Sequence, residues 1–231
     1  MYKKIGIIGA LSIEIQLLKE NLNIIDLVKY AGFEFYICSK NNSIIVITAC
    51  GVGKVNAASC TQVMIDKFSV DVIINTGVAG GLRKDLKTCD IIISEDITYH
   101  DVRPEQLKKF SPYKETFNAD DELKALALRA YKKCNFKESN CFVGRIVTGD
   151  CFVSDEILKA SIIATYKPCC VEMEGAAIGH VAVINDIPFL VIRCISDHAN
   201  EEKDLTYSIF EQKASYQSAN LLLKMMEEKN C

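Results

Sequence analysis

The 231-residue sequence contains no tryptophan, only three histidines, and no C-x-x-C pair among its eleven cysteines. Because zinc sites depend on closely spaced Cys and His ligands, the sequence offers no metal site. The cysteine count is odd, and Cys50 and Cys194 lie inside apolar runs, where a free thiol packs as a small core residue. We therefore expect neither a metal nor a disulfide framework, and a reducing, cytoplasmic location.

The sequence also lacks an excess of charge of either sign, with 27 basic and 30 acidic residues. A nucleic-acid-binding protein usually carries a basic surface, so we expect no nucleic-acid partner. No run approaches the roughly 18 apolar residues of a membrane span. Glu14 interrupts the apolar run after Lys3 and Lys4, which argues against a secretory signal. We expect no membrane partner.

Apolar runs of strand length alternate with segments of helical period, which predicts an α/β protein with a mixed, mainly parallel sheet covered by helices. The absence of any repeat or linker predicts one domain over residues 1–231. Residues 100–118 form the only loop-rich region. The predicted strands are 5–9, 27–30, 33–38, 43–49, 70–76, 90–97, 142–148, 169–172 and 189–196, and the predicted helices are 11–21, 54–68, 120–133, 155–165, 175–185 and 207–228.

Two of the predicted strand exits are informative because ligands of such sheets bind beyond the carboxyl ends of the strands. The first strand leads into Glu14, in the first turn of a helix, where a carboxylate can also simply complement the helix dipole. The second exit has three glycines within residues 77–81. Glycine permits close backbone approach to a ligand, although a tight turn would need nothing more.

The other two exits carry charged side chains. Glu172 and Glu174 flank Met173 where a buried strand becomes a helix, so one carboxylate can face a site while the other pairs elsewhere, or both can be structural. Arg193 stands inside an apolar strand and needs a partner, and Asp197 closes that strand. These four exits are the candidate site.

A dinucleotide-binding oxidoreductase is a weaker alternative. Gly51-Val52-Gly53-Lys54 follows a strand and opens a helix, with Asp71 near the expected acidic spacing. Asn56 stands where the third glycine of G-x-G-x-x-G belongs. The sequence has neither a P-loop motif nor a G-x-S-x-G elbow.

The four exits read IGIIGALSIE, INTGVAGGL, VEMEGAAI and VIRCISD, and in this order they resemble the bacterial 5′-methylthioadenosine/S-adenosylhomocysteine nucleosidases. This family belongs to the purine nucleoside phosphorylase and uridine phosphorylase superfamily. The resemblance extends over nearly the whole chain, including GVGKVNAA and IVTGDCFV. It implies a three-layer αβα sandwich, a homodimer with sites near the interface, no cofactor, and hydrolysis of the N-glycosidic bond of a small purine nucleoside with release of adenine.

The resemblance also implies roles for individual residues. Glu14 matches the carboxylate that activates the attacking water, and Asp197 matches the acid that acts on N7 of the purine. The substrate-binding positions are Phe152 and Val153 on adenine, Met173 and Glu174 on the ribose, Arg193 near the water and the cluster of Glu172 to Glu174, Ser196 beside the acid, Val78 near the water or the ribose, and Tyr207 near the ribose.

Two departures from the family pattern bear on the substrate. Val78 replaces a small hydroxyl residue, and residues 100–118 differ from the stretch that helps form the pocket for the 5′-alkylthio group, partly across the dimer. Val102, Pro112, Tyr113 and Phe117 are candidates for an apolar pocket there. Substrates of the 5′-deoxyadenosine or futalosine type therefore stay open.

Two alternatives to hydrolysis also stay open. A nucleoside phosphorylase of the same fold would need cationic donors for phosphate, yet no arginine occurs between Met1 and Leu82, and Glu14 would repel the anion. A non-enzymatic nucleoside-binding domain would have no need of a water-activating base. Hydrolysis is the prediction that accounts for Glu14, Glu174 and Asp197 together.

Overall fold

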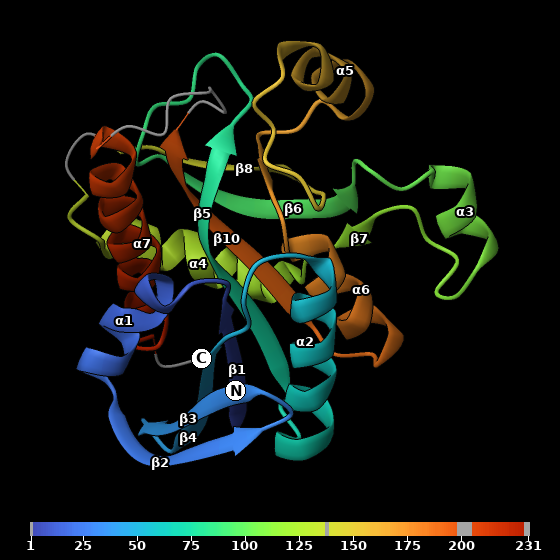
Figure 1. Ribbon diagram of the computed structural model, residues 1–231. Helices are drawn as coiled ribbons and strands as arrows, with labels where there is room; N and C mark the ends of the chain where they lie inside the picture. The colour runs from blue at the N-terminus through green and yellow to red at the C-terminus, as the bar shows by residue number, and fades with distance from the viewer. Residues whose placement is uncertain (1, 137–138, 198–204, 229–231) are drawn as a thin grey trace.

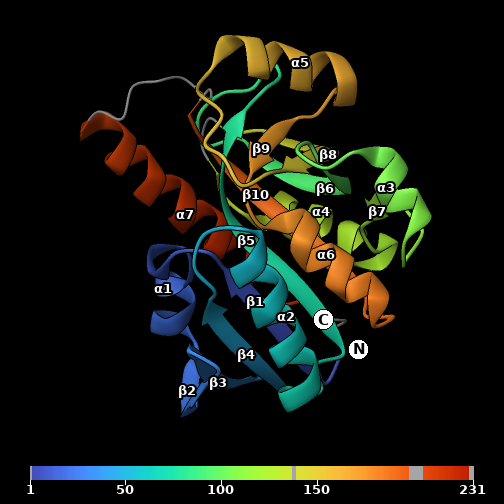
Figure 2. The ribbon, with the colours of Figure 1, turned by 45° about the vertical axis from the view of Figure 1, so that its right-hand side comes forward.

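The computed structural model describes residues 2–136, 139–197 and 205–228, which form one sheet between two layers of helices (Figures 1 and 2). The strands are β1 (Lys4–Gly9), β2 (Asn23–Tyr30), β3 (Phe33–Lys40), β4 (Ser43–Ala49), β5 (Val72–Gly81), β6 (Ile91–Tyr99), β7 (Phe117–Asn118), β8 (Cys141–Thr148), β9 (Cys170–Glu172) and β10 (Phe189–Asp197). The helices are α1 (Ser12–Asn21), α2 (Lys54–Phe68), α3 (Pro104–Lys109), α4 (Asp121–Lys133), α5 (Glu156–Tyr166), α6 (Gly175–Ile184) and α7 (Leu205–Met225).

The strand order is β10-β6-β8-β9-β5-β1-β4-β3-β2, with β7 beside β6. Because β10 also pairs with β5, the strands β5, β10, β6, β8 and β9 close into a ring. The mixed sheet is confirmed: among the described strands, β1 and β8 pair only in parallel, and β5 pairs in parallel with β1 and β10. The antiparallel pairs are β2–β3, β3–β4, β5–β9, β6–β7 and β6–β10. The short turns that join β2, β3 and β4 impose antiparallel pairing there.

The central strands are buried on both faces, which explains their continuous apolar runs. In β10, Leu190 and Ile192 pack with α1, α4 and α7, whereas Val191 and Ile195 pack with α2 and α6. The predicted three-layer arrangement is therefore confirmed. No helix of the described part of the chain is long and apolar enough to cross a membrane.

One local prediction holds with an addition, and another was wrong. Residues 100–118 lie mostly outside helices and strands, as predicted, but they include the short strand β7 and the short helix α3, where Pro104 at the first helical position pre-sets a helical φ. Strand β5 continues to Gly81 instead of ending at Thr76. Its last residues pair with β9 and β10, so the glycines stand inside a strand and not in a turn.

Candidate active site

A cavity of about 370 Å³ opens where β1, β5, β9 and β10 end, which is a volume suited to a small ligand. It is lined by Ala10, Leu11, Glu14, Val52, Val78, Ala79, Gly80, Cys151, Phe152, Val153, Val171, Glu172, Met173, Glu174, Ser196, Asp197 and Glu211.

The cavity brings together nearly all of the predicted site residues, namely Glu14, Val78, Phe152, Val153, Glu172, Met173, Glu174, Ser196 and Asp197. Arg193 is an exception, because it lies behind the wall with 1% of its surface exposed. Tyr207 falls in α7, but its side chain lies outside the described residues. None of residues 100–118, all of which the structure describes, lines the cavity. Phe117, a candidate for an apolar pocket, is buried and stacks on His180.

Glu14 is held by three main-chain donors. Its Oε2 accepts hydrogen bonds from the amides of Ala10 (2.6 Å) and Leu11 (2.9 Å), and its Oε1 accepts one from Val78 (3.0 Å). Burial raises the pKa of the carboxyl group, while the charge of Arg193 and these amides act in the opposite direction. Glu14 thus accepts hydrogen bonds at the start of its own helix and also lines the cavity.

A glycine makes room for Glu14. A side chain at Gly77 would collide with the Glu14 carboxylate and with the Arg193 guanidinium. Gly77 therefore serves the close packing of charged groups beside a strand, which differs from the turn that the sequence left open.

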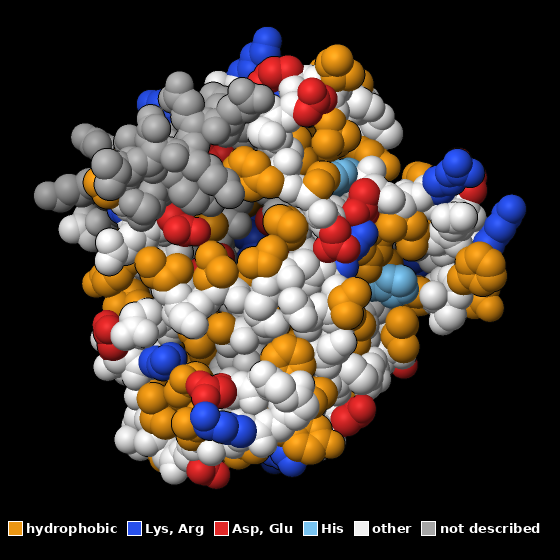
Figure 3. Space-filling model, viewed as in Figure 1, with side chains coloured by type: hydrophobic (Ala, Val, Ile, Leu, Met, Phe, Trp, Pro, Cys, Tyr) orange, Lys and Arg blue, Asp and Glu red, His pale blue; other side chains and the backbone are white. Residues whose placement is uncertain are grey.

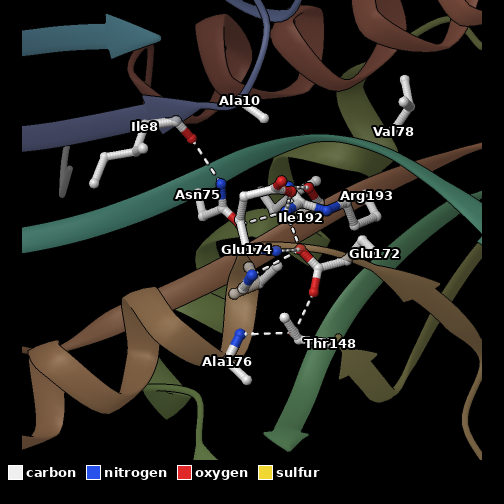
Figure 4. A network of polar contacts seen from close by, with 12 residues as sticks. Ile8, Ala10, Asn75, Val78, Thr148, Glu172, Glu174, Ala176, Ile192 and Arg193 are labelled. Atoms are coloured by element: carbon white, nitrogen blue, oxygen red, sulfur yellow. Dashed lines mark hydrogen bonds and ion pairs between the residues drawn. The ribbon is translucent and has the colours of Figure 1, made fainter. Parts of the chain in front are cut away.

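Arg193 is the cation at the centre of a buried polar network (Figure 4). Its Nη2 donates to Asn75 Oδ1 (2.6 Å) and to Glu172 Oε2, and lies 3.7 Å from Glu174 Oε2. Asn75 in turn donates to the carbonyl of Ile8 (2.8 Å). Burial lowers the pKa of the guanidinium, but the surrounding glutamates outweigh this effect and raise it.

Glu172 is saturated by protein donors. Its Oε1 accepts from the Thr148 hydroxyl, and its Oε2 accepts from Arg193 and from the amides of Glu174 (3.0 Å) and Gly175 (2.7 Å). These contacts fix the turn between β9 and α6. Of the two carboxylates in this turn, Glu172 is therefore the structural one.

Among the described residues, the Glu174 carboxylate accepts one hydrogen bond, from the Gly53 amide to its Oε1 (2.9 Å). Burial and the nearby Glu172 charge raise the pKa of Glu174 to about 7, against the opposing effect of Arg193. Compared with Glu172, this carboxylate keeps more capacity to accept hydrogen bonds from a ligand.

Asp197 and the segment Cys151–Val153 also line the cavity. The Ser196 hydroxyl donates to Asp197 Oδ2 (2.7 Å). Phe152 is 42% exposed, whereas Val153 is buried, so the ring of Phe152 is the part of this segment available to a planar ligand. Burial raises the pKa of the Cys151 thiol, which lowers its reactivity toward oxidants.

The charge of the cavity is one-sided. Its carboxylates are Glu14, Glu172, Glu174, Asp197 and Glu211, and no Lys, Arg or His of the described residues lines it. Sequence reasoning missed Glu211, because helix α7 shows no motif that would indicate a position near the strand ends. It also passed over Thr148 and Asn75, whose only signal was a polar residue near the end of an apolar strand.

The dinucleotide alternative does not fit this geometry. Asp71 accepts from the amides of Lys3 and Lys4 (2.8 Å each), at the amino end of β5. Gly53 follows β4, and β1 pairs in parallel with both β4 and β5. Gly53 thus lies beyond the carboxyl ends of these parallel strands, and Asp71 lies at their amino ends. The Gly53 amide donates to Glu174.

Comparison with known proteins adds independent information. The family model described as the phosphorylase superfamily matches residues 4–227. The 5′-methylthioadenosine/S-adenosylhomocysteine nucleosidase of Staphylococcus carnosus is 37% identical over 228 residues, which cover 96% of this chain and 99% of that protein. The nucleosidase of the same name from Treponema pallidum is 36% identical, over 96% of this chain and 92% of its own.

Two solved structures are similar to this chain over nearly its whole length. The nucleosidase of Colwellia psychrerythraea, in complex with adenine, is similar with a TM-score of 0.91 and 35% identity, covering 98% of this chain and 95% of that one. The futalosine hydrolase of Helicobacter pylori is similar with a TM-score of 0.88 and 30% identity, covering 96% and 97%.

Proposed function

The chain belongs to the phosphorylase superfamily and, within it, to the family of 5′-methylthioadenosine/S-adenosylhomocysteine nucleosidases, and we propose that it hydrolyses the N-glycosidic bond of these two nucleosides. The products are adenine and the 5-substituted ribose. The observation that carries the proposal is the cavity itself, in which Glu14 and Asp197 face one space together with a nearby aromatic ring and no basic side chain of the described residues.

Asp197 is the proposed general acid. Adenine leaves poorly as an anion, so a proton delivered to N7 lowers the barrier to breaking the glycosidic bond. General acid catalysis of this kind typically contributes about 10²–10⁴-fold to a rate. The neighbouring Ser196 hydroxyl orients the carboxylate by its hydrogen bond.

Glu14 is the proposed general base. Its three main-chain donors hold the carboxylate in one orientation. Burial raises the pKa of this carboxyl group against the opposing effects of Arg193 and the amides, and a raised pKa makes the carboxylate a stronger base toward water. As the bond breaks, the ribosyl centre becomes cationic, and the carboxylates of Glu14 and Glu174 stabilise this charge. Glu174 also accepts hydrogen bonds from the ribose hydroxyls in this proposal.

Water rather than phosphate is the proposed nucleophile. A phosphate dianion next to several carboxylates would be repelled, and Arg193, the cation nearest to them, is already engaged by Asn75 and Glu172. The test is analysis of the products with and without phosphate. Free 5-substituted ribose at a phosphate-independent rate supports hydrolysis, whereas formation of a ribose 1-phosphate would overturn it.

The 5′-thioether preference rests on the relatives, because this chain differs from the family pattern at Val78 and over residues 100–118. A panel of methylthioadenosine, S-adenosylhomocysteine, 5′-deoxyadenosine, futalosine, adenosine and inosine would rank the 5′ groups. Release of adenine fastest from the two thioethers is the expected result. Absence of base release from every member would favour a nucleoside-binding domain without turnover.

A homodimer is part of the proposal. Val52 and Phe152 line the cavity and have exposed side chains, and Val55 and Ile157, a few residues further along the chain from each, are exposed as well. On the face shown in Figure 3, hydrophobic side chains form a broad band across the middle, and Lys and Arg lie mainly near the outline. Such a face fits an interface between two copies. A dimer mass in analytical ultracentrifugation is the expected result.

A cytoplasmic location is also proposed. All ten cysteines within the described residues are free. Free thiols are typical of proteins kept in a reducing compartment. Fractionation of cells followed by immunodetection would test this expectation.

A further inference from the structure

Three charged residues at the edge of the cavity form a cluster that the proposed reaction does not use. Lys54 Nζ lies 2.6 Å from Asp101 Oδ2 and 3.6 Å from Asp150 Oδ2. The three side chains come from the start of α2, the end of β6 and the end of β8, which are distant in sequence. The cluster therefore joins three separate strand exits.

The main chain at the start of α2 reinforces this connection. The Gly53 amide donates to Glu174 (2.9 Å), and the next amide, that of Lys54, donates to Asp150 Oδ1 (2.8 Å). Two successive amides thus hold the proposed ribose carboxylate and the residue that precedes Cys151–Val153. Amides in the first turn of a helix have no partners within the helix, so they are available for these carboxylates.

Asp101 binds the main-chain amide of Asp150. The Asp150 amide donates to Asp101 Oδ2 (2.9 Å), the same oxygen that accepts from the Lys54 ammonium group. Asp150 is consequently held at its amide by Asp101 and at its carboxylate by Lys54. Burial would raise the pKa of Asp101, but the Lys54 and Asp150 donors outweigh it and lower that pKa, which keeps the bridge charged.

The residues that follow Asp150 directly line the cavity. We propose that Lys54 and Asp101 are positioning residues that set the place of the segment Cys151–Val153, and hence of the purine, relative to Glu174. The inference rests on the proposed function, in which this segment contacts adenine. It adds that purine affinity depends on an ion pair that touches no part of the substrate.

The experiment compares Lys54→Met with the matched control Lys124→Met. Lys124 also pairs with two carboxylates, Glu95 and Asp121 (2.8 Å each), and its side chain is 12% exposed against 21% for Lys54. For Lys54→Met we expect the KM for methylthioadenosine and the Kd for free adenine to rise by about tenfold, with a smaller change in kcat. Lys124→Met should leave all three near the wild-type values.

Two further variants test the mechanism. Asp101→Asn still accepts from the Asp150 amide but loses its charge, and we expect the double variant with Lys54→Met to be no worse than the worse single variant. Lys54→Arg should restore most of the adenine affinity. An arginine variant as impaired as Lys54→Met, or additive effects in the double variant, would overturn the ion-pair mechanism.

The outcomes separate this inference from the proposed function. If the wild-type protein releases adenine and Lys54→Met has the KM and adenine Kd of Lys124→Met, the inference fails and the function stands. If the wild-type protein neither binds adenine nor cleaves any nucleoside of the panel, both fail.

Discussion

Two polar clusters flank the cavity, and they differ mainly in their access to water. Around Arg193, the side chains of Arg193 and Glu172 are 2% exposed and that of Glu174 is 7% exposed. Around Lys54, the exposed fractions are 21% for Lys54, 28% for Asp101 and 47% for Asp150. The same kinds of charge are thus placed in two different environments.

The difference in exposure to water also determines which partners the charged groups of each cluster need. The glutamates around Arg193 are matched by main-chain amides and by Thr148, because a buried charge without such partners is strongly destabilising. Around Lys54, water can replace a lost partner, so each contact contributes less to stability. The cluster around Arg193 should therefore contribute more to stability. The cluster around Lys54 should mainly affect the position of the segment Cys151–Val153.

The most severe change is Arg193→Met, which leaves several buried glutamates without their cation. We expect the free energy of unfolding to fall by about 3–5 kcal/mol, with loss of turnover. Urea denaturation measures the first effect. Arg145→Met, which removes a half-buried pair with Asp96, is the control and should cost clearly less. Equal losses in the two variants would contradict the contrast between buried and exposed pairs.

Asp197→Asn lies outside both clusters and should separate chemistry from stability. We expect turnover to fall by about 10²–10⁴-fold, because Asn cannot deliver the proton. Adenine binding and the melting temperature should stay near the wild-type values. Rates of adenine release and a thermal melt provide both measurements, and near-normal turnover would remove Asp197 from its role.

Thr148→Val tests the neutral part of the buried cluster. The Thr148 hydroxyl donates to Glu172 and accepts from the Ala176 amide (2.8 Å), and valine can do neither. We expect a loss of about 1–3 kcal/mol in the free energy of unfolding. The Thr61 hydroxyl donates to the carbonyl of Ala57 in its own helix (2.7 Å), so Thr61→Val should cost less in the same denaturation experiment.

The pH dependence tests the raised pKa of Glu174, about 7. If the ionised form binds the ribose, the KM should rise by up to about tenfold per pH unit below this value. The folded pKa exceeds the ordinary value of 4.5, so the folded chain holds the proton more tightly. The contribution of Glu174 to stability is therefore full below 4.5 and is lost as the pH rises through about 7. Glu174→Gln should flatten both profiles.

The smallest expected effect is that of Lys54→Met on stability. A half-exposed pair of this kind contributes about 0.2–1 kcal/mol. High salt should remove most of the difference from the wild-type protein, because exposed charges are screened. Urea denaturation at low and high salt measures this. A loss as large as that of Arg193→Met would abolish the distinction between the clusters.

Much of the fold could be predicted from local pattern. The continuous apolar runs of β1 and β10 are buried on both faces, so their burial leaves a direct signature in the sequence. The extension of β5 through its glycines could not be predicted, because glycine has low strand propensity and β9 and β10 supply the pairing from far along the chain.

The candidate site, too, could be predicted only in part. Residue type at a strand exit, together with the family resemblance, was enough to select Glu14, Glu174 and Asp197, since polar side chains at the ends of apolar strands are conspicuous. It could not say which of Glu172 and Glu174 is saturated by the protein, because the side-chain donors to Glu172 are Thr148 and Arg193, on other strands.

By itself, then, the sequence determined the α/β class, the alternation of strands and helices, and the residue types at each strand end, because these depend on local pattern. Only the tertiary structure decided that Arg193 lies behind the cavity wall, that Gly77 makes room for Glu14, and that Lys54 connects Asp101 to Asp150. These are contacts between distant segments. Burial and partnership of a charge depend on which strands become neighbours, and that is a property of the folded sheet.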